Sequence, residues 1–398
     1  MKKDIYEQPS RLENVKMSTI RKMMDAAAKL KNEGKDVVAF TVGEPDFNTP
    51  QAIKDATVDC LAQNLTHYTS NRGRLDIRQE VAKKILADTG LDYNPETEIL
   101  MTSSGAEAIN NALLGMIDEG DEVILVTPSF VSYEQTIFLC KGVPVYLPLR
   151  QENNFQIDKQ ELESKITDRT RFLIMNNPCN PTGGVLNDES MKAIADICVK
   201  YNLAVFSDEI YSQLIYDGLK FHSIAEYPGM RERTVMMNGF SKTYAMTGWR
   251  VGYLAMDERF MKNILRVHQY STTTGVTFIQ AALAKTMNTP EVMADVKKMV
   301  DAFAGRRDIV VEELSKIDGI SFVKPEGAFY VLINVSKTGM SGETFANRLL
   351  NEKYVSSVPA IAFGAEYGDY IRISFATGDE DIRRGIQRIR EFVDENMK

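Results

Sequence analysis

The chain lacks the residues from which most disulfide, zinc and histidine sites are built. It has four cysteines in 398 residues, far apart and without C-x-x-C spacing, which argues against a disulfide framework and a zinc site. Its three histidines, His67, His222 and His268, lie too far apart to share a helical face. We therefore expect no bound metal and no histidine-based catalytic triad. Scattered unpaired thiols are typical of the cytoplasm, where we expect this protein.

Long apolar runs and an excess of basic residues are also missing. No run approaches the roughly 20 apolar residues that a membrane-spanning helix needs, and residues 1–7 carry charge rather than the apolar core of a signal peptide. The formal net charge of -8 offers no footprint for nucleic acid or anionic lipid. We expect small molecules and other copies of the chain as partners, and neither nucleic acid nor membrane.

What the sequence does contain is a regular alternation of short apolar runs with longer amphipathic stretches. The expected strands are 99–101, 122–126, 144–147, 171–175, 204–207, 234–237 and 251–255. Such alternation predicts an α/β fold with a mostly parallel sheet and helices on both faces.

The pattern differs at the two ends of the chain. A helix is expected over residues 18–34, ending at Gly34. Towards the C-terminus we expect a long helix at 292–316 and strands near 320–334 and 371–375. A terminal helix is expected from about residue 379. Because the sequence shows no flexible linker, we expect the domains to pack against each other at any boundary. The expected large domain is 46–286, and the expected small α+β domain is 287–398. Residues 1–45 are expected to pack with the small domain.

Small or aromatic residues follow the first two strands, where ligands of open α/β sheets collect. Ser104, Gly105 and Ala106 open a helix, and their backbone N–H groups would hold a phosphate, although an ordinary helix cap has the same composition. Phe130 follows the next strand. Its ring would stack on a flat ligand or belong to the core.

Three later strand ends carry polar side chains. Asn180 lies in a turn rich in Pro, Asn and Gly. Asp208 ends its strand, with Tyr211 shortly after it, and a helix N-cap is the other reading of Asp208. Lys242 follows a strand on a polar, Gly-bearing loop. Partial desolvation there would lower the lysine pKa and make the amine a nucleophile towards aldehydes.

Two arginines complete the set. Arg250 stands where the next strand opens, and Arg372 lies inside an apolar strand, where it needs either a carboxylate ligand or a salt bridge. A phosphate cradle, a stacking ring, a carboxylate, a phenol, a lysine and two arginines are the groups that a pyridoxal 5'-phosphate site needs.

Four motifs resemble those of the class I/II aminotransferases of fold type I. They are NPCNPTG at 177–183, SDEIY at 207–211, SKTYAMTGWRVG at 241–252 and YIRIS at 370–374. Their order and spacing match the family from about Gly43 to Phe375. The AMTGWR run at 245–250 resembles the bacterial branch that contains aspartate and aromatic aminotransferases.

The resemblance implies roles for individual residues around pyridoxal phosphate. Lys242 would form the internal aldimine and move the substrate proton, and Asp208 would pair with the pyridinium nitrogen. Tyr211 and Asn180 would bind the ring hydroxyl, and Phe130 would stack on the ring.

The resemblance also implies how the phosphate and the substrate are held. The phosphate would be bound by Ser104, Gly105, Ala106, Ser241 and Arg250. Arg372 would clamp the substrate α-carboxylate, helped by Asn180 and the backbone of Gly43.

In this family a tyrosine at the position of Tyr68 reaches the phosphate of the neighbouring subunit, which implies a homodimer with shared sites. Two positions depart from the family pattern. Gly239 stands where many relatives carry serine, so one phosphate hydrogen bond is missing, and Ala360 stands where many carry glycine, near the substrate entrance.

The implied activity is transamination from an L-amino acid, such as aspartate or an aromatic amino acid, to a 2-oxo acid, with 2-oxoglutarate as the expected acceptor and ping-pong kinetics. A cysteine-S-conjugate β-lyase shares the fold and the lysine and is the alternative. A cofactor-sensing transcription regulator would need a DNA-binding module, for which this length leaves no room. No residue that recognises the substrate side chain can be placed from the sequence.

Overall fold

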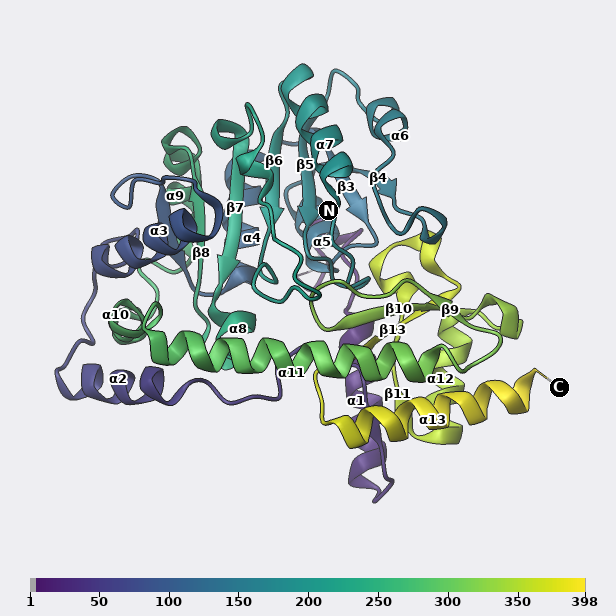
Figure 1. The fold of residues 1–398 in the computed structure, drawn as a ribbon. Coiled ribbons are helices and arrows are strands. Elements are labelled where there is room, and N and C mark those ends of the chain that lie inside the picture. Colours follow the sequence, from purple (N-terminus) through teal and green to yellow (C-terminus); the bar gives the residue numbers. More distant parts are fainter. Residues whose placement is uncertain (1–4, 398) are drawn as a thin grey trace.

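A seven-stranded sheet forms the centre of the larger part of the molecule (Figure 1). The computed structural model describes residues 5–397. In spatial order the strands are β2 (Ile99–Thr102), β8 (Gly252–Met256), β7 (Thr234–Gly239), β6 (Ala204–Asp208), β5 (Thr170–Asn176), β3 (Glu122–Thr127) and β4 (Val143–Pro148). All neighbouring pairs are parallel except those of β8, which runs antiparallel to both its neighbours. The seven expected strands and the mostly parallel sheet are confirmed.

Helices cover both faces of this sheet because its strands are apolar on both sides. Leu100 of β2 packs in one core cluster, while its neighbours Ile99 and Met101 pack in another, as the alternation of side chains along a strand requires. One face is covered by α4 (Gly105–Met116), α5 (Ser132–Leu139) and α9 (Glu258–Ser271). The other is covered by α3 (Leu75–Thr89), α7 (Asp188–Lys200) and α10 (Thr277–Thr286).

The N-terminal segment joins the C-terminal part of the chain. Helix α1 (Thr19–Asn32) begins after Ser18, whose hydroxyl accepts a hydrogen bond from the Arg21 N–H, and it ends just before Gly34 as expected. The short strand β1 (Val38–Ala39) then pairs in parallel with β11 (Val355–Ser356). This pairing leads the chain directly to residues 41–43, which enter the site described below.

A second, four-stranded antiparallel sheet lies in the C-terminal part. Its order is β12 (Val358–Pro359), β13 (Tyr370–Ser374), β10 (Tyr330–Asn334) and β9 (Ser321–Phe322). The helices packed with it are α12 (Gly342–Lys353) and α13 (Asp379–Asn396). Neither α12 nor the two-residue strands β11 and β12 were expected from the sequence.

Helix α11 (Pro290–Leu314) runs unbroken along both parts of the molecule (Figure 1). Its N-cap is Thr289, and a proline occupies its first turn, which is favourable because the proline lacks an N–H that would be unpaired there. The remaining α-helices of the described residues are α2 (Gln51–Ala62), α6 (Lys159–Ser164) and α8 (Phe240–Thr243).

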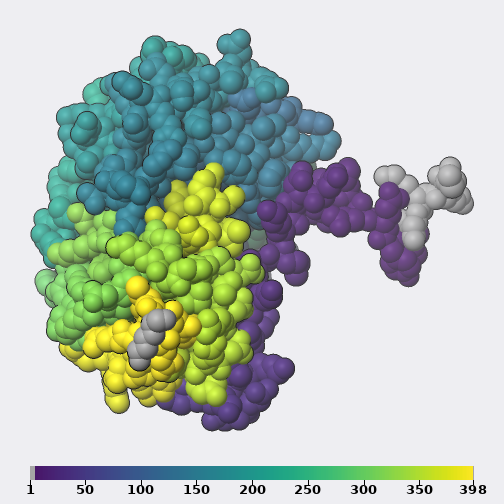
Figure 2. Space-filling view, turned by 90° about the vertical axis from the view of Figure 1, so that its right-hand side faces the viewer, coloured from purple at the N-terminus to yellow at the C-terminus, as the bar shows by residue number. Residues whose placement is uncertain are grey.

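The described residues before α1 extend away from the body of the molecule (Figure 2). Three large apolar side chains on or beside this extension are strongly exposed, namely Ile5, Tyr6 and Met17.

Within residues 5–397, none of the helices combines the length and the apolar character that crossing a bilayer requires. The same residues contain no cluster of three or more His, Cys, Asp or Glu side chains suited to a metal ion.

Candidate active site

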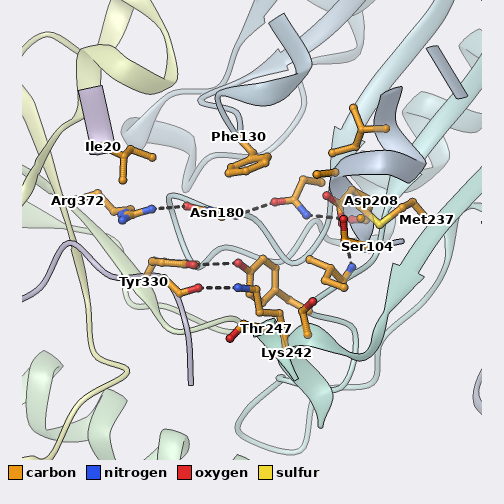
Figure 3. A pocket seen from close by; sticks show the side chains of 18 of the residues that line it. Ile20, Ser104, Phe130, Asn180, Asp208, Met237, Lys242, Thr247, Tyr330 and Arg372 are labelled. Carbon is orange, nitrogen blue, oxygen red and sulfur yellow. Dashed lines mark hydrogen bonds between the residues drawn. The ribbon is translucent and has the colours of Figure 1, made fainter. Parts of the chain in front are cut away.

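A cavity of about 310 Å³ opens at the carboxyl ends of β5, β6 and β7, between the two sheets. It collects every site residue expected from the sequence except Tyr68: Gly43, Ser104, Gly105, Ala106, Phe130, Asn180, Asp208, Tyr211, Ser241, Lys242, Arg250 and Arg372. Tyr68 lies outside this cavity and is 88% exposed. Figure 3 shows Phe130 on one side of the cavity and Lys242 with Tyr330 on the opposite side.

Lys242 lies on the short helix α8 rather than on a loop, which corrects the sequence expectation. The helix follows directly from strand β7, so the lysine is held close to the sheet. Its Nζ donates a hydrogen bond to the carbonyl oxygen of Gly43 at 2.6 Å. Burial lowers the pKa of the Lys242 amine to about 8, while the charge of Glu44 opposes this shift. A substantial neutral fraction is therefore available slightly above neutral pH.

Asp208 is a buried carboxylate at the end of β6. Its Oδ2 accepts a hydrogen bond from the Tyr133 hydroxyl, and its Oδ1 accepts one from the Ile210 N–H at 3.0 Å. Burial raises the pKa of Asp208 to about 6, opposed by these two donors and by the charge of Lys242. The carboxylate can thus act as an anionic partner for a protonated group in the cavity. No α-helix follows it, since Tyr211 lies in a turn.

Arg372 is a buried cation on β13 without a carboxylate partner. It is 2% exposed, and within residues 5–397 it forms no salt bridge, so the salt-bridge alternative is wrong for the described part of the chain. Its Nη1 donates to Asn180 Oδ1 at 3.0 Å and its Nη2 to the Thr41 carbonyl at 2.7 Å, while its Nε has no hydrogen-bond partner among the described residues. A planar cation with donors left over is suited to a carboxylate ligand.

The N-terminus of α4 forms a cradle of backbone N–H groups. Ser104 precedes the helix with a positive φ of 95°, and Gly105 is its first residue. The first N–H groups of any helix lack partners within the helix, and the helix dipole favours an anion there. Arg250, which is exposed and donates to the Thr247 carbonyl at 2.8 Å, adds positive charge to the same cavity. Ser241 contributes a hydroxyl-bearing side chain.

These residues fit pyridoxal 5'-phosphate. The helix N-terminus and Arg250 match a phosphate, and Phe130 offers a ring face. The buried Asp208 carboxylate matches a protonated ring nitrogen, and the lowered pKa of Lys242 matches an aldehyde.

Tyr330 lines the cavity although the sequence did not indicate it. Its hydroxyl lies 2.9 Å from that of Tyr211, and its ring covers the guanidinium of Arg372 at 4.6 Å. Tyr330 also explains the glycine at position 43, because a Cβ added there would overlap the Tyr330 hydroxyl. In the sequence Tyr330 opens the apolar run YVLIN and looks like a core residue, so only the pairing of β10 with β13 could have revealed it.

The two departures from the family pattern lie in tightly packed places. A Cβ added to Gly239 would lie 3.0 Å from the Cα of Gly252, closer than side-chain atoms normally approach, so a serine there would require the two strands to shift. Ala360 is fully buried at the start of a 3-10 helix, Ala360–Phe363, whose Phe363 ring lies 5.2 Å from the Arg372 guanidinium. Ala360 itself is not among the residues that line the cavity.

Comparison with known proteins gives a consistent result. The family model described as aminotransferase class I and II matches residues 35–389. Aromatic-amino-acid aminotransferase 2 of Thermococcus litoralis is 40% identical over 97% of this chain and 98% of its own length. The aspartate aminotransferase of Pyrococcus abyssi is 39% identical over the same shares.

A solved structure shares the whole fold. Aspartate aminotransferase from Thermus thermophilus with maleate superimposes with a TM-score of 0.92 at 34% identity, covering 97% of this chain and 100% of the other.

Proposed function

The chain belongs to the class I and II aminotransferases, pyridoxal-phosphate-dependent enzymes of fold type I, and on this basis we propose a specific reaction and a role for each site residue. The reaction is the transfer of the amino group of an L-amino acid, aspartate or aromatic, to 2-oxoglutarate in a ping-pong sequence. The observation that carries this proposal is that Lys242, Asp208 and Arg372 share one cavity. When bound, pyridoxal phosphate supplies an aldehyde carbon that takes up the amino group and a ring that accepts electrons.

In this proposal Arg372 binds and orients the substrate. Its unpaired Nε and its two Nη groups suit a carboxylate, and Asn180 and the Tyr330 ring hold the guanidinium in place. Because this clamp fixes the α-carboxylate, the substrate Cα has a defined position relative to Lys242.

Lys242 is the proposed proton carrier. Its amine has a pKa of about 8, so it can both take a proton from the substrate Cα and return one within the working pH range.

The remaining side chains hold the cofactor. Asp208 binds the protonated ring nitrogen, while Tyr211 and Asn180 offer polar groups to the ring hydroxyl. Phe130 covers the ring face. The phosphate is bound by the N-terminus of α4, that is Ser104, Gly105 and Ala106, with Ser241 and Arg250.

The cavity lining favours an aromatic donor over aspartate. Its described cations are Lys242, Arg250 and Arg372, and all three have roles in binding the cofactor or the α-carboxylate. Helix α1 contributes Ile20 and Met24, and Figure 3 shows Ile20 beside Arg372. A side chain projecting from an α-carboxylate on Arg372 would therefore meet an apolar surface.

We also propose a homodimer in the cytoplasm. Tyr68 is exposed and outside its own chain's cavity, which suits a residue that completes the site of a partner. Other large apolar side chains are exposed nearby in the chain, with Val58 64% and Leu61 42% exposed on α2. Sedimentation of the holoenzyme should give twice the chain mass, and a Tyr68→Ala variant should lose cofactor more readily without dissociating.

A donor panel tests the reaction. Phenylalanine, tyrosine, aspartate and alanine are each mixed with the holoenzyme and 2-oxoglutarate, and glutamate is measured. The expected result is fastest glutamate formation with the aromatic donors, abolished in Lys242→Ala and kept in Lys262→Ala, which changes an exposed lysine of α9. Fastest turnover with aspartate would show that a cation outside the described cavity lining recognises its side chain. Pyruvate release from cystathionine without any 2-oxo acid would favour the β-lyase instead.

A further inference from the structure

Tyr133 is a buried tyrosine that contacts a site residue from outside the cavity. It lies on α5, is 1% exposed and does not line the cavity. Its hydroxyl nevertheless donates a hydrogen bond to Asp208 Oδ2. No motif singled this residue out, because in the sequence it looks like an ordinary core aromatic.

Two neighbouring rings hold Tyr133 in place. Phe130 packs edge-on at a centroid distance of 5.8 Å and an interplanar angle of 76°, and Phe206 packs at 6.4 Å and 63°. Phe130 itself lines the cavity and Phe206 precedes Asp208 by two positions on β6. The phenol therefore has little freedom to leave the carboxylate.

The two oxygens of Asp208 are held by donors of different kinds. Oδ1 accepts the Ile210 backbone N–H at 3.0 Å, and Oδ2 accepts the Tyr133 hydroxyl. Because each donor occupies only one lone pair of its oxygen, the carboxylate keeps its remaining lone pairs for a ligand in the cavity. Removal of the Tyr133 hydroxyl would free one oxygen without affecting the other.

Tyr133 favours the ionised form of Asp208. Burial and the nearby Asp208 charge raise the pKa of Tyr133 well above its ordinary value, so the phenol stays a proton donor across the working range. A donor stabilises a carboxylate more than a carboxylic acid, and this opposes the burial that raises the pKa of Asp208 to about 6. The other titratable groups that interact electrostatically with Asp208 are Cys179, Glu209, Tyr211 and Lys242. Among these four, Lys242 is the one whose charge favours ionisation.

We propose that Tyr133 is a positioning residue that keeps Asp208 ionised and directed into the cavity, and so sets the lower pH limit at which the chain retains pyridoxal phosphate. This inference rests on the proposed role of Asp208 as partner of the ring nitrogen. A neutral Asp208 offers no charge to a protonated nitrogen, so cofactor is lost as pH falls through the Asp208 pKa.

The test compares Tyr133→Phe with Tyr146→Phe. Tyr146 is a matched control because its half-buried phenol also donates to a carboxylate, Glu134 Oε1 at 2.6 Å, away from the cavity. Each full-length holoenzyme is dialysed at a series of pH values, and the retained pyridoxal phosphate is measured. In the cofactor-free chains the Asp208 carboxyl is titrated by carbon-13 NMR.

We expect Tyr133→Phe to raise the pH of half-retention and the Asp208 titration midpoint by about one to two units, the size expected for one hydrogen bond to a charged group. Tyr146→Phe should leave both unchanged. At high pH the Tyr133→Phe chain should retain cofactor as the wild type does, which also shows that it is folded. Unchanged midpoints in Tyr133→Phe would overturn the proposal.

A second variant separates this role from general packing. In an Asp208→Asn background, adding Tyr133→Phe should not shift the pH dependence of cofactor retention further, and an additional shift would contradict the proposal. If the wild type itself does not bind pyridoxal phosphate, the proposed function fails. The NMR titration of the cofactor-free chains then still decides whether Tyr133 controls the ionisation of Asp208.

Discussion

The hydroxyls of Tyr211 and Tyr330 lie 2.9 Å apart, and the Tyr330 ring covers the guanidinium of Arg372. One tyrosine thus contacts both the expected cofactor side and the expected substrate side of the cavity. Since Tyr330 is on β10, next to the strand that carries Arg372, the small antiparallel sheet holds the two residues together.

Removing the Tyr330 hydroxyl should weaken the site modestly. A Tyr330→Phe variant keeps the ring over Arg372 and loses one neutral hydrogen bond, which is worth about a fivefold change in an equilibrium constant. We expect kcat/KM for the amino donor to fall by about that factor, measured by steady-state kinetics. Tyr330→Ala should lose far more, because the ring packing disappears too. Equal losses of kcat/KM in Tyr330→Phe and Tyr330→Ala would contradict separate contributions of the hydroxyl and the ring.

Replacing Arg372 by lysine should mainly damage substrate binding. Lysine keeps the charge but cannot supply the planar fork of donors, and Asn180 Oδ1 and the Thr41 carbonyl lose their partners. We expect kcat/KM to fall by about 100-fold, from the loss of hydrogen bonds to a charged ligand.

The control is Arg307→Lys, because Arg307 is a 1% exposed arginine whose ionic partners, Asp217 and Asp308, lie outside the cavity. Arg307→Lys should lower the free energy of unfolding and leave KM for the amino donor unchanged. If KM rises as much in Arg307→Lys as in Arg372→Lys, the effect of Arg372→Lys is not local.

The pKa of Lys242 predicts how its reactivity changes with pH. Burial lowers this pKa to about 8, so in the cofactor-free chain the amine should become reactive around that pH. The exposed Lys262 of α9 provides the comparison in the same chain. Labelling with an amine-directed reagent, followed by peptide mass spectrometry at each pH, measures both in one sample. Identical midpoints for the two lysines would rule out a desolvated Lys242.

Glu209 should make the stability of the fold depend on pH. It is 2% exposed, accepts hydrogen bonds from Ser207 and Ser223 at 2.9 and 2.7 Å, and has a pKa raised by burial to about 8. A carboxyl whose pKa is higher in the folded than in the unfolded state contributes stability below about 4.3, and this contribution is lost as pH rises through about 8.

The free energy of unfolding of the wild type should therefore fall between pH 5 and pH 8. In a Glu209→Gln variant this fall should be smaller by at least about 1 kcal/mol, because glutamine does not ionise. Urea unfolding of the cofactor-free chains at the two pH values provides the comparison. Glu312→Gln, which changes an exposed glutamate of α11, should behave as the wild type. If Glu209→Gln keeps the wild-type pH dependence, Glu209 is ionised in the folded chain.

The sequence was most informative where local chemistry and periodicity coincide. The seven strands could be predicted because each is an apolar run between amphipathic stretches, and Asp208 and Lys242 could be picked out because they follow such runs. The two-residue strands β11 and β12 could not, since strands this short are defined by their partners rather than by their own residues. The expected domain boundaries stay a prediction.

Residues that act through tertiary contacts were missed. Tyr133 and Tyr330 look like core aromatics in the sequence, and only packing brings their hydroxyls to Asp208 and Tyr211. Thr41 participates through its backbone carbonyl, which no side-chain motif can reveal.

The short segment that follows β1 has a thermodynamic consequence for every ligand of the cavity. The carbonyls of Thr41 and Gly43 accept hydrogen bonds from Arg372 and Lys242, at 2.7 and 2.6 Å. Within the described residues the contacts of Arg372 use only one N–H of Nη1 and one of Nη2, so a carboxylate can bind the remaining donors, and the Thr41 carbonyl fixes their orientation before any ligand arrives. Substitutions that alter how β1 pairs with β11 can therefore change substrate affinity without touching the substrate.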